Sequence, residues 1–210
     1  MDAGTETDAS RPGDGGRENS VETNLAYQEE PWREELIDGK LIAMAPPVTN
    51  HNRVKLNISN LFWNYLRGKR CEVLPDGEAA YLTDLDYYIP DVMVVCDPEK
   101  VKEDGVHGAP DLVVEVLSPG TVRYDRGRKM QIYEASGVRE YWLVNPADKV
   151  VEQYLLKDGK LVLSEVYALR PEWELRRMKP EERASVVTEF KCSLYEDLSI
   201  RLEDVFDRVR

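Results

Sequence analysis

The pattern of apolar and polar positions changes several times along the chain, and each change predicts a different element. The stretch "EELIDGKLIAMAPP" places two short apolar runs on either side of Asp38-Gly39, which is typical of a tight β-hairpin. From Asn50 onward, apolar side chains recur at helical spacing as far as Gly68. We therefore expect a hairpin followed by a helix, with Asn50 as the N-cap and Gly68 at the end of the helix.

Strand-like segments follow this helix. The stretch "CEVLPDGEAAYL" is strand-like with a turn at residues 75–77, and "YYIPDVMVVCD" predicts a second strand with Pro90 near its start. A loop over residues 97–110 leads into a third strand at residues 112–117. That strand reads Leu-Val-Val-Glu-Val-Leu, and so apolar a run predicts a strand buried on both faces.

The second half of the chain predicts a helix, a strand and a second hairpin. Thr121 is the expected N-cap of a helix over "VRYDRGRKMQIYEAS", and Gly137 is its expected C-terminal residue. "EYWLVNP" predicts a fourth strand, and "VVEQYLLKDGKLVLSEVYAL" predicts a hairpin. A charged loop or short helix at residues 171–184 and a covering segment at the C-terminus complete the chain. This order predicts an α/β (mixed α+β) fold with a mixed central sheet flanked by helices and a hairpin toward each end.

Composition divides the chain into a tail and a domain. Residues 1–24 hold almost no apolar side chains, which predicts a disordered acidic tail. Residues 25–210 then form a single domain whose core spans about residues 50–146. The net charge of −12 argues against non-specific nucleic-acid binding. Residues 123–139 are nevertheless locally basic, with five Lys and Arg against two Asp and Glu.

The cysteines and the hydropathy predict the compartment. The three cysteines are far apart in the sequence and form no Cys-x-x-Cys pair: Cys71, Cys96 and Cys192. We interpret them as reduced thiols in a cytoplasmic protein. The N-terminus has no apolar signal region and no apolar run is long enough to span a bilayer, so we expect no contact with membranes.

Two acidic residues interrupt otherwise apolar strands, Asp91 in "IPDVMVV" and Glu115 in "LVVEV". A buried ionised carboxylate costs several kcal/mol unless it is paired or binds a cation. If the two strands pair, both carboxylates converge at one edge of the sheet, and Mg²⁺ is the usual cation for such a pair. Asp125, Lys129 and Tyr133 follow at i, i+4 and i+8, so one side of the next helix would present a lysine toward the same pocket.

Several segments, in this order, resemble the Uma-type family of restriction endonucleases in the PD-(D/E)xK nuclease superfamily: "YYIPDVMVV", "GAPDLVVEVLSPGT" and "YDRGRKMQIYEASGVREYWLVNP". The resemblance covers about residues 34–166 and includes the "ELIDGKL" hairpin and His51. It implies a restriction-endonuclease-like core of helix, three strands, helix and strand. It also implies hydrolysis of DNA phosphodiester bonds.

The resemblance assigns roles to individual residues. Asp91 and Glu115 match the motif acids, which with the Val116 carbonyl would bind Mg²⁺ or Mn²⁺. The superfamily places its lysine two residues after the second acid, where this chain has Leu117, so Lys129 becomes the residue expected to assist the attacking water. Beyond these motif residues, we expect four residues to support the site: His51, Glu78, Asp125 and Tyr133. We expect three arginines to contact phosphates: Arg123, Arg126 and Arg128.

Other interpretations stay open at this point. Glu115 would serve equally as a structural ion-pair partner of Arg128 or Lys129, and Asp91 as a turn residue after a proline. Glu35 is a weaker candidate for a further metal-facing carboxylate. The acidic balance and the displaced lysine favour a catalytically silent nuclease-fold protein that binds a partner or nucleic acid.

A two-carboxylate glycosidase is a third hypothesis, which predicts a cleft lined with exposed aromatic rings. On the nuclease hypothesis a homodimer is expected, because cleavage of both DNA strands needs two sites.

Overall fold

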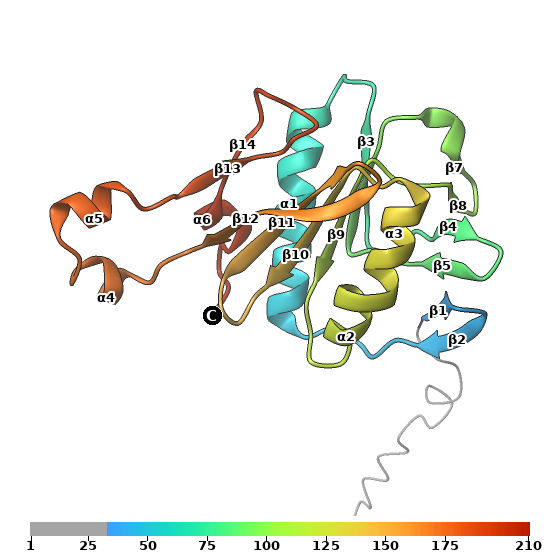
Figure 1. The fold of residues 1–210 in the computed structure, drawn as a ribbon, viewed down its shortest axis with the longest axis horizontal. Coiled ribbons are helices and arrows are strands. Elements are labelled where there is room, and N and C mark those ends of the chain that lie inside the picture. Colours follow the sequence, from blue (N-terminus) through green and yellow to red (C-terminus); the bar gives the residue numbers. More distant parts are fainter. Residues whose placement is uncertain (1–32) are drawn as a thin grey trace, which may run out of the picture. The chain divides into compact units, whose positions relative to one another are not determined.

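The computed structural model describes residues 33–210 (Figure 1). The tail predicted for residues 1–24 lies outside this range. None of the helices in the described range is long and apolar enough to cross a membrane.

A mixed six-stranded sheet forms the centre of the part that the structure describes, in the order β12-β11-β10-β9-β6-β3. Strands β9 and β10 pair in parallel, and the other neighbours pair antiparallel. The bounds are β3 (Glu72–Pro75), β6 (Val92–Val95), β9 (Leu112–Val116), β10 (Glu140–Asn145), β11 (Val150–Lys157) and β12 (Lys160–Ala168). The predicted α/β fold with a mixed central sheet is confirmed.

Helices cover both faces of this sheet (Figure 1). Helix α1 (Thr49–Leu66) packs Val54, Ile58 and Phe62 onto one face, in a cluster that includes Val114 and Trp142 of the sheet. Helix α3 (Met130–Ser136) belongs to the cluster on the other face. All five residues of β9 are buried, so the prediction of a strand buried on both faces is confirmed.

Side chains of β9 alternate between these two faces. Val114 belongs to the cluster under α1, whereas Val113 packs with Tyr133 and Tyr141 in the cluster under α3. Because alternate residues of a strand share a face, Glu115 points to the α3 side. This alternation decides which helix can supply a partner for the buried glutamate.

A second sheet lies beside the first, in the order β2-β1-β5-β4-β8-β7. Its strands are β1 (Glu34–Ile37), β2 (Lys40–Ala43), β4 (Ala80–Thr83), β5 (Asp86–Tyr88), β7 (Val101–Lys102) and β8 (Gly105–His107). The predicted N-terminal hairpin is confirmed, with Asp38 and Gly39 both at positive φ (54° and 72°) in its turn.

Two strand predictions need correction. The segment predicted as one strand, "YYIPDVMVVCD", is divided between β5 in the second sheet and β6 in the central sheet. Pro90 lies at the division and has no N–H to donate to a strand ladder. The predicted loop at residues 97–110 contains a 3₁₀ turn, η2 (Pro98–Lys100), and the short hairpin of β7 and β8.

Two helix predictions are also partly wrong. Helix α1 begins at Thr49 with Val48 at the N-cap position, and the Asn50 side chain instead donates to the backbone carbonyl of Arg210 (2.5 Å). The second predicted helix is divided into α2 (Val122–Tyr124), the π-helical turn η3 (Asp125–Lys129) and α3. Thr121 lies at the N-cap position of α2, but its side chain makes no capping hydrogen bond. Gly137 ends α3 in the left-handed conformation (φ 92°), as predicted.

The prediction that all cysteines are reduced is wrong for one pair. Cys71 and Cys96 form a disulfide. Strands β3 and β6 pair antiparallel with Glu72 opposite Val95, so the two flanking cysteines face each other across the ladder. The two cysteines are 25 residues apart in the sequence, so their proximity could not be predicted from local patterns. Cys192 is free and buried.

The C-terminal region forms an arm and a cover. Helices α4 (Glu172–Leu175) and α5 (Pro180–Ala184) lie on an arm that projects from the body (Figure 1). The chain then returns through β13 (Glu189–Lys191), β14 (Ser199–Arg201) and α6 (Leu202–Val205). Phe190, Leu202 and Val205 join the cluster under α1, which confirms the predicted covering segment.

Candidate active site

Pairing of β6 with β9 brings the two predicted acids together. Val92 pairs with Val114 in antiparallel register, so Asp91 and Glu115 occupy the next opposed positions. Asp91 Oδ2 also accepts a hydrogen bond from the backbone N–H of Val116 (2.7 Å). The carboxylate of one strand is thus tied to the backbone of the other.

Lys129 lies among three carboxylates. Its Nζ is 2.8 Å from Glu35 Oε1, 3.3 Å from Glu115 Oε1 and 3.6 Å from Asp125 Oδ1. These four side chains, which we call the inner cluster, are each at most 5% exposed. Glu35 reaches the cluster from β1, and its Oε1 also accepts the backbone N–H of Ile89 (2.8 Å). Three separate elements, β1, β9 and the segment Asp125–Lys129, therefore build the inner cluster.

The short η3 segment supplies two members of this cluster. Gly127 departs from helical geometry (φ −115°, ψ −106°), which separates α2 from α3. Within η3, Asp125 and Lys129 are both buried, and they form an ion pair at i, i+4. One turn further on, Tyr133 donates its hydroxyl to Glu115 Oε1 (2.8 Å). The predicted i, i+4, i+8 stripe therefore faces Glu115.

The inner cluster contains more acidic than basic side chains, with three carboxylates around one ammonium. Burial raises the pKa of Glu115 well above its ordinary value; the Lys129 ammonium opposes this rise, and the charges of Asp125 and Asp91 add to it. Burial likewise raises the pKa of Asp125. Burial alone would lower the pKa of Lys129, but Glu115, Glu35 and Asp125 together raise it well above its ordinary value. The lysine therefore stays charged, whereas burial disfavours the ionised forms of Glu115 and Asp125.

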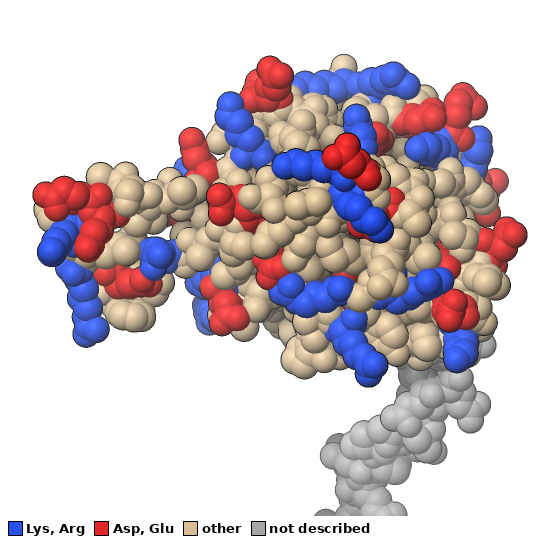
Figure 2. Space-filling view, viewed as in Figure 1, with Lys and Arg blue, Asp and Glu red and all other residues tan. Residues whose placement is uncertain are grey.

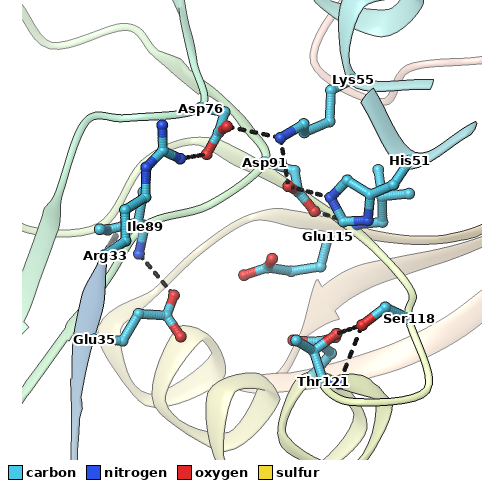
Figure 3. Close-up of polar contacts among 12 residues, drawn as sticks. Arg33, Glu35, His51, Lys55, Asp76, Ile89, Asp91, Glu115, Ser118 and Thr121 are labelled. Carbon is cyan, nitrogen blue, oxygen red and sulfur yellow. Dashed lines mark hydrogen bonds and ion pairs between the residues drawn. The ribbon is translucent and has the colours of Figure 1, made fainter. Parts of the chain in front are cut away.

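A second group of polar side chains, which we call the outer network, consists of Asp91 and the residues around it: Arg33, His51, Lys55 and Asp76 (Figure 3). Asp91 Oδ1 lies 2.8 Å from His51 Nε2 and 3.7 Å from Lys55 Nζ. Lys55 also donates to Asp76 Oδ2 (2.7 Å), and Arg33 forms an ion pair with the same carboxylate. Figure 3 shows Glu115 between Glu35 on one side and the Asp91, His51 and Lys55 group on the other.

Other predicted site residues lie elsewhere. Glu78 is exposed and belongs to neither group. Arg126 pairs with Glu152 (2.5 Å), and Arg128 pairs with Asp38 and Asp86 (3.3 and 3.2 Å). Within residues 33–210, Arg123 is exposed and forms no ion pair. The ion-pair partner of Glu115 is thus Lys129 and not Arg128.

Sequence reasoning missed three members of the site, which are Arg33, Lys55 and Asp76. Lys55 follows His51 by one helical turn on α1, which is the signal that could have found it. Asp76 lies in the turn after β3 and looked like ordinary turn chemistry. Its role became visible only because the fold places that turn beside α1.

The residues present fit a cation that is bound through few protein ligands. In the described range, no three His, Cys, Asp or Glu side chains are arranged to hold a metal ion by themselves. Mg²⁺ is usually bound through one or two carboxylates, with waters and substrate phosphates completing the shell. Asp91 and Glu115 match that pattern, and Asp125 Oδ1 is buried without a hydrogen-bond partner.

The chain has a mixed α/β fold that is similar to that of a solved structure. This structure, with a TM-score of 0.58 and 19% identity, covers 82% of this chain and 89% of its own. Its title describes a "putative nuclease belonging to DUF820" from Anabaena variabilis ATCC 29413. At this identity the similarity shows the fold alone.

The chain belongs to the Uma2 family, whose model carries the description "Putative restriction endonuclease" and matches residues 21–186. It is 37% identical over 142 residues to "Uncharacterized protein slr1290" from Synechocystis sp., covering 66% of this chain and 75% of that protein. A second Synechocystis protein, "Uncharacterized protein sll1609", is 28% identical over 152 residues, covering 70% of this chain and 86% of its own. The family resemblance of the sequence motifs is confirmed.

Proposed function

We propose that the protein is a metal-dependent endonuclease that hydrolyses DNA phosphodiester bonds, with Asp91 and Glu115 as ligands of Mg²⁺ or Mn²⁺. One observation carries this proposal: the two acids meet across β6 and β9, and Lys129 reaches Glu115 from the next helical segment. Family membership and the nuclease-like fold support it. A homodimer, which would provide two sites for cutting both strands, stays a prediction.

The chain's own groups would prepare the site. The N–H of Val116 and the imidazole of His51 hold the Asp91 carboxylate in one orientation, and Tyr133 does the same for Glu115. Lys129 would orient the attacking water and stabilise the negative charge that develops on the phosphoryl group. A bound Mg²⁺ supplies Lewis acidity toward the phosphoryl oxygen. The Val116 carbonyl remains a proposed third ligand.

Negative charge in the inner cluster gives a reason for a cation. Glu35, Glu115 and Asp125 surround a single ammonium, so full ionisation would leave an excess of two negative charges before Asp91 is counted. Buried like charges raise the pKa of carboxylates or recruit a counter-ion. A divalent cation at Asp91 and Glu115 would stabilise the ionised forms.

Separate basic residues, and not one continuous basic surface, would contact the DNA. Figure 2 shows Lys and Arg interspersed with Asp and Glu over the visible face. Arg126 and Arg128 would have to exchange Glu152, Asp38 and Asp86 for phosphates, whereas Arg123 is exposed and has no ion-pair partner within residues 33–210. Each phosphate contact makes DNA binding more sensitive to salt.

Calorimetric titration of Mg²⁺ and Mn²⁺, with plasmid nicking on the same samples, tests the proposal. We expect the wild type to bind metal and to nick, and Glu115→Gln and Asp91→Asn to lose both activities. Glu103→Gln, at an exposed position, is the matched control and should retain both. The proposal fails if the wild type binds neither metal and nicks no plasmid.

A second candidate function is DNA or partner binding without cleavage. It is favoured by the position of the Lys129 ammonium, which lies closer to Glu35 (2.8 Å) than to Glu115 (3.3 Å) and is enclosed by carboxylates. A lysine held in this way stabilises the fold without reaching a substrate. DNA binding by the wild type without nicking in either metal would favour this candidate.

A further inference from the structure

The inner cluster and the outer network differ in their access to solvent. Side chains of His51, Asp91 and Lys55 are 11%, 10% and 9% exposed, whereas that of Lys129 is 2% exposed. Asp76 and Arg33 are more open still, at 18% and 22%. A phosphate that approaches Asp91 from solvent therefore meets the outer network before it meets the inner cluster.

Within the outer network, one carboxylate holds two cations. Asp76 binds Arg33 through one oxygen and Lys55 through the other. This trio carries a net charge of +1 beside Asp91, in contrast to the negative inner cluster. A carboxylate that fixes two cations reduces the side-chain entropy they lose when an anion binds.

The Lys55 ammonium has donors to spare. An ammonium offers three donors, and within residues 33–210 Lys55 hydrogen-bonds only to Asp76. Its other acidic neighbour, Asp91 Oδ1, is 3.7 Å away and already lies 2.8 Å from His51. Lys129, in contrast, lies within 3.6 Å of three carboxylates.

We infer that Lys55, held by Asp76 beside Arg33, binds a phosphate of the nucleic-acid backbone next to Asp91. The inference rests on the proposed function for its substrate class, and it adds the position at which the phosphate enters. Lys55 lies on the rigid helix α1, one turn after His51, so its position relative to Asp91 is fixed by the packing of α1 on the sheet. Lys129 then remains inside the site and Lys55 faces the substrate.

Binding of a fluorescently labelled DNA duplex, measured by anisotropy in Mg²⁺, tests this assignment. All proteins carry Glu115→Gln, so that the duplex stays intact. We expect Lys55→Met to weaken binding by about ten-fold and to reduce the slope of log affinity against log salt by about one. Lys55→Arg, which keeps the charge, should restore most of the affinity. Lys102→Met, at an exposed position, is the control and should bind like the parent protein.

Three results would overturn the inference. The first is equal affinity of Lys55→Met and Lys102→Met for the duplex. The second is an affinity of Lys55→Arg as low as that of Lys55→Met, which would mean that the shape of this side chain and not its charge determines the affinity for the duplex. The third is Lys55-dependent binding of inorganic phosphate in a calorimetric titration without duplex binding, which would assign a free-phosphate site.

Failure of the hydrolytic function gives a different result. If Lys55 controls duplex affinity but the protein with Glu115 intact nicks no plasmid, the phosphate position stands and the endonuclease proposal fails.

Discussion

Glu115 and Glu140 are two buried glutamates on neighbouring parallel strands, and they are stabilised in different ways. Glu115 is 4% exposed and Glu140 is fully buried. Glu140 Oε1 accepts from Trp142 Nε1 and Gln153 Nε2, both at 2.6 Å, and Oε2 accepts from the backbone N–H and the hydroxyl of Ser193 at 2.8 and 2.5 Å. Neutral donors thus occupy both oxygens of Glu140.

Glu115 has a different environment. It accepts one neutral hydrogen bond, from Tyr133, and shares a single ammonium with two other carboxylates. Donors around a carboxylate stabilise its ionised form, whereas like charges destabilise it. Burial of a glutamate is therefore no sign of function by itself, and the way in which its charge is balanced distinguishes a structural role from a site that needs a cation.

Removal of the Glu140 side chain should have the largest effect on stability. Glu140→Ala leaves the donors of Trp142, Gln153 and Ser193 buried without acceptors, and we expect a loss of about 4–5 kcal/mol in the free energy of unfolding. Urea denaturation measures it. The exposed Glu165→Ala is the control and should change stability by less than about 0.5 kcal/mol. A small loss in Glu140→Ala would show that this carboxylate is dispensable to the fold.

Matched glutamine variants should separate the two glutamates directly. Glu140→Gln turns an amide N–H toward groups that themselves donate, so we expect a loss of about 2–3 kcal/mol. Glu115→Gln removes one of several like charges and keeps an acceptor for Tyr133, so its stability in EDTA should stay within about 1 kcal/mol of the wild type. Urea denaturation of both variants at neutral pH gives the comparison. Equal losses in the two variants would contradict the difference between the two environments.

A smaller effect should appear in the pH dependence of stability. Because burial raises the pKa of Glu115 well above 4.5, the folded state binds this proton more tightly than the unfolded chain does. The resulting stabilisation is complete below about pH 4.5 and is lost as the pH rises through the folded pKa. In EDTA, the free energy of unfolding of the wild type should fall by about 1 kcal/mol or more over this window relative to Glu115→Gln.

Urea denaturation of both proteins at a series of pH values measures that difference. Asp125, whose pKa is also raised, titrates in both proteins and interacts with Glu115, so the difference between the curves reports Glu115 together with its effect on Asp125. Parallel curves would mean that Glu115 ionises as freely in the folded state as in the unfolded chain.

Local sequence signals predicted much of the fold. The Asp38-Gly39 turn, the apolar strand around Glu115 and the end of α3 at Gly137 were all confirmed, because each depends on side-chain chemistry within a few residues. Errors arose where non-local pairing decided the outcome. Pro90 divides a predicted strand between two sheets, and Cys71 meets Cys96 only because β3 pairs with β6.

The candidate site divides in the same way. Strand alternation and helical spacing predicted that Asp91, Glu115 and Lys129 would gather, and the structure brings them together. Arg33, Lys55 and Asp76 were missed, because their participation depends on how the turn that holds Asp76 packs beside α1. Glu140 lies at the start of a predicted strand. Nothing in the sequence indicated that five donor atoms, from Trp142, Gln153, Cys192 and Ser193, would surround its carboxylate.

By itself, the sequence determined the elements, their order, the family motifs and the acidic residues placed in apolar strands, because these follow from periodicity and local chemistry. Only the tertiary structure decided how each buried charge is balanced. The free energy of a carboxylate depends on donors and charges within a few ångströms of it, and for Glu115 and Glu140 most of those groups come from other strands and helices.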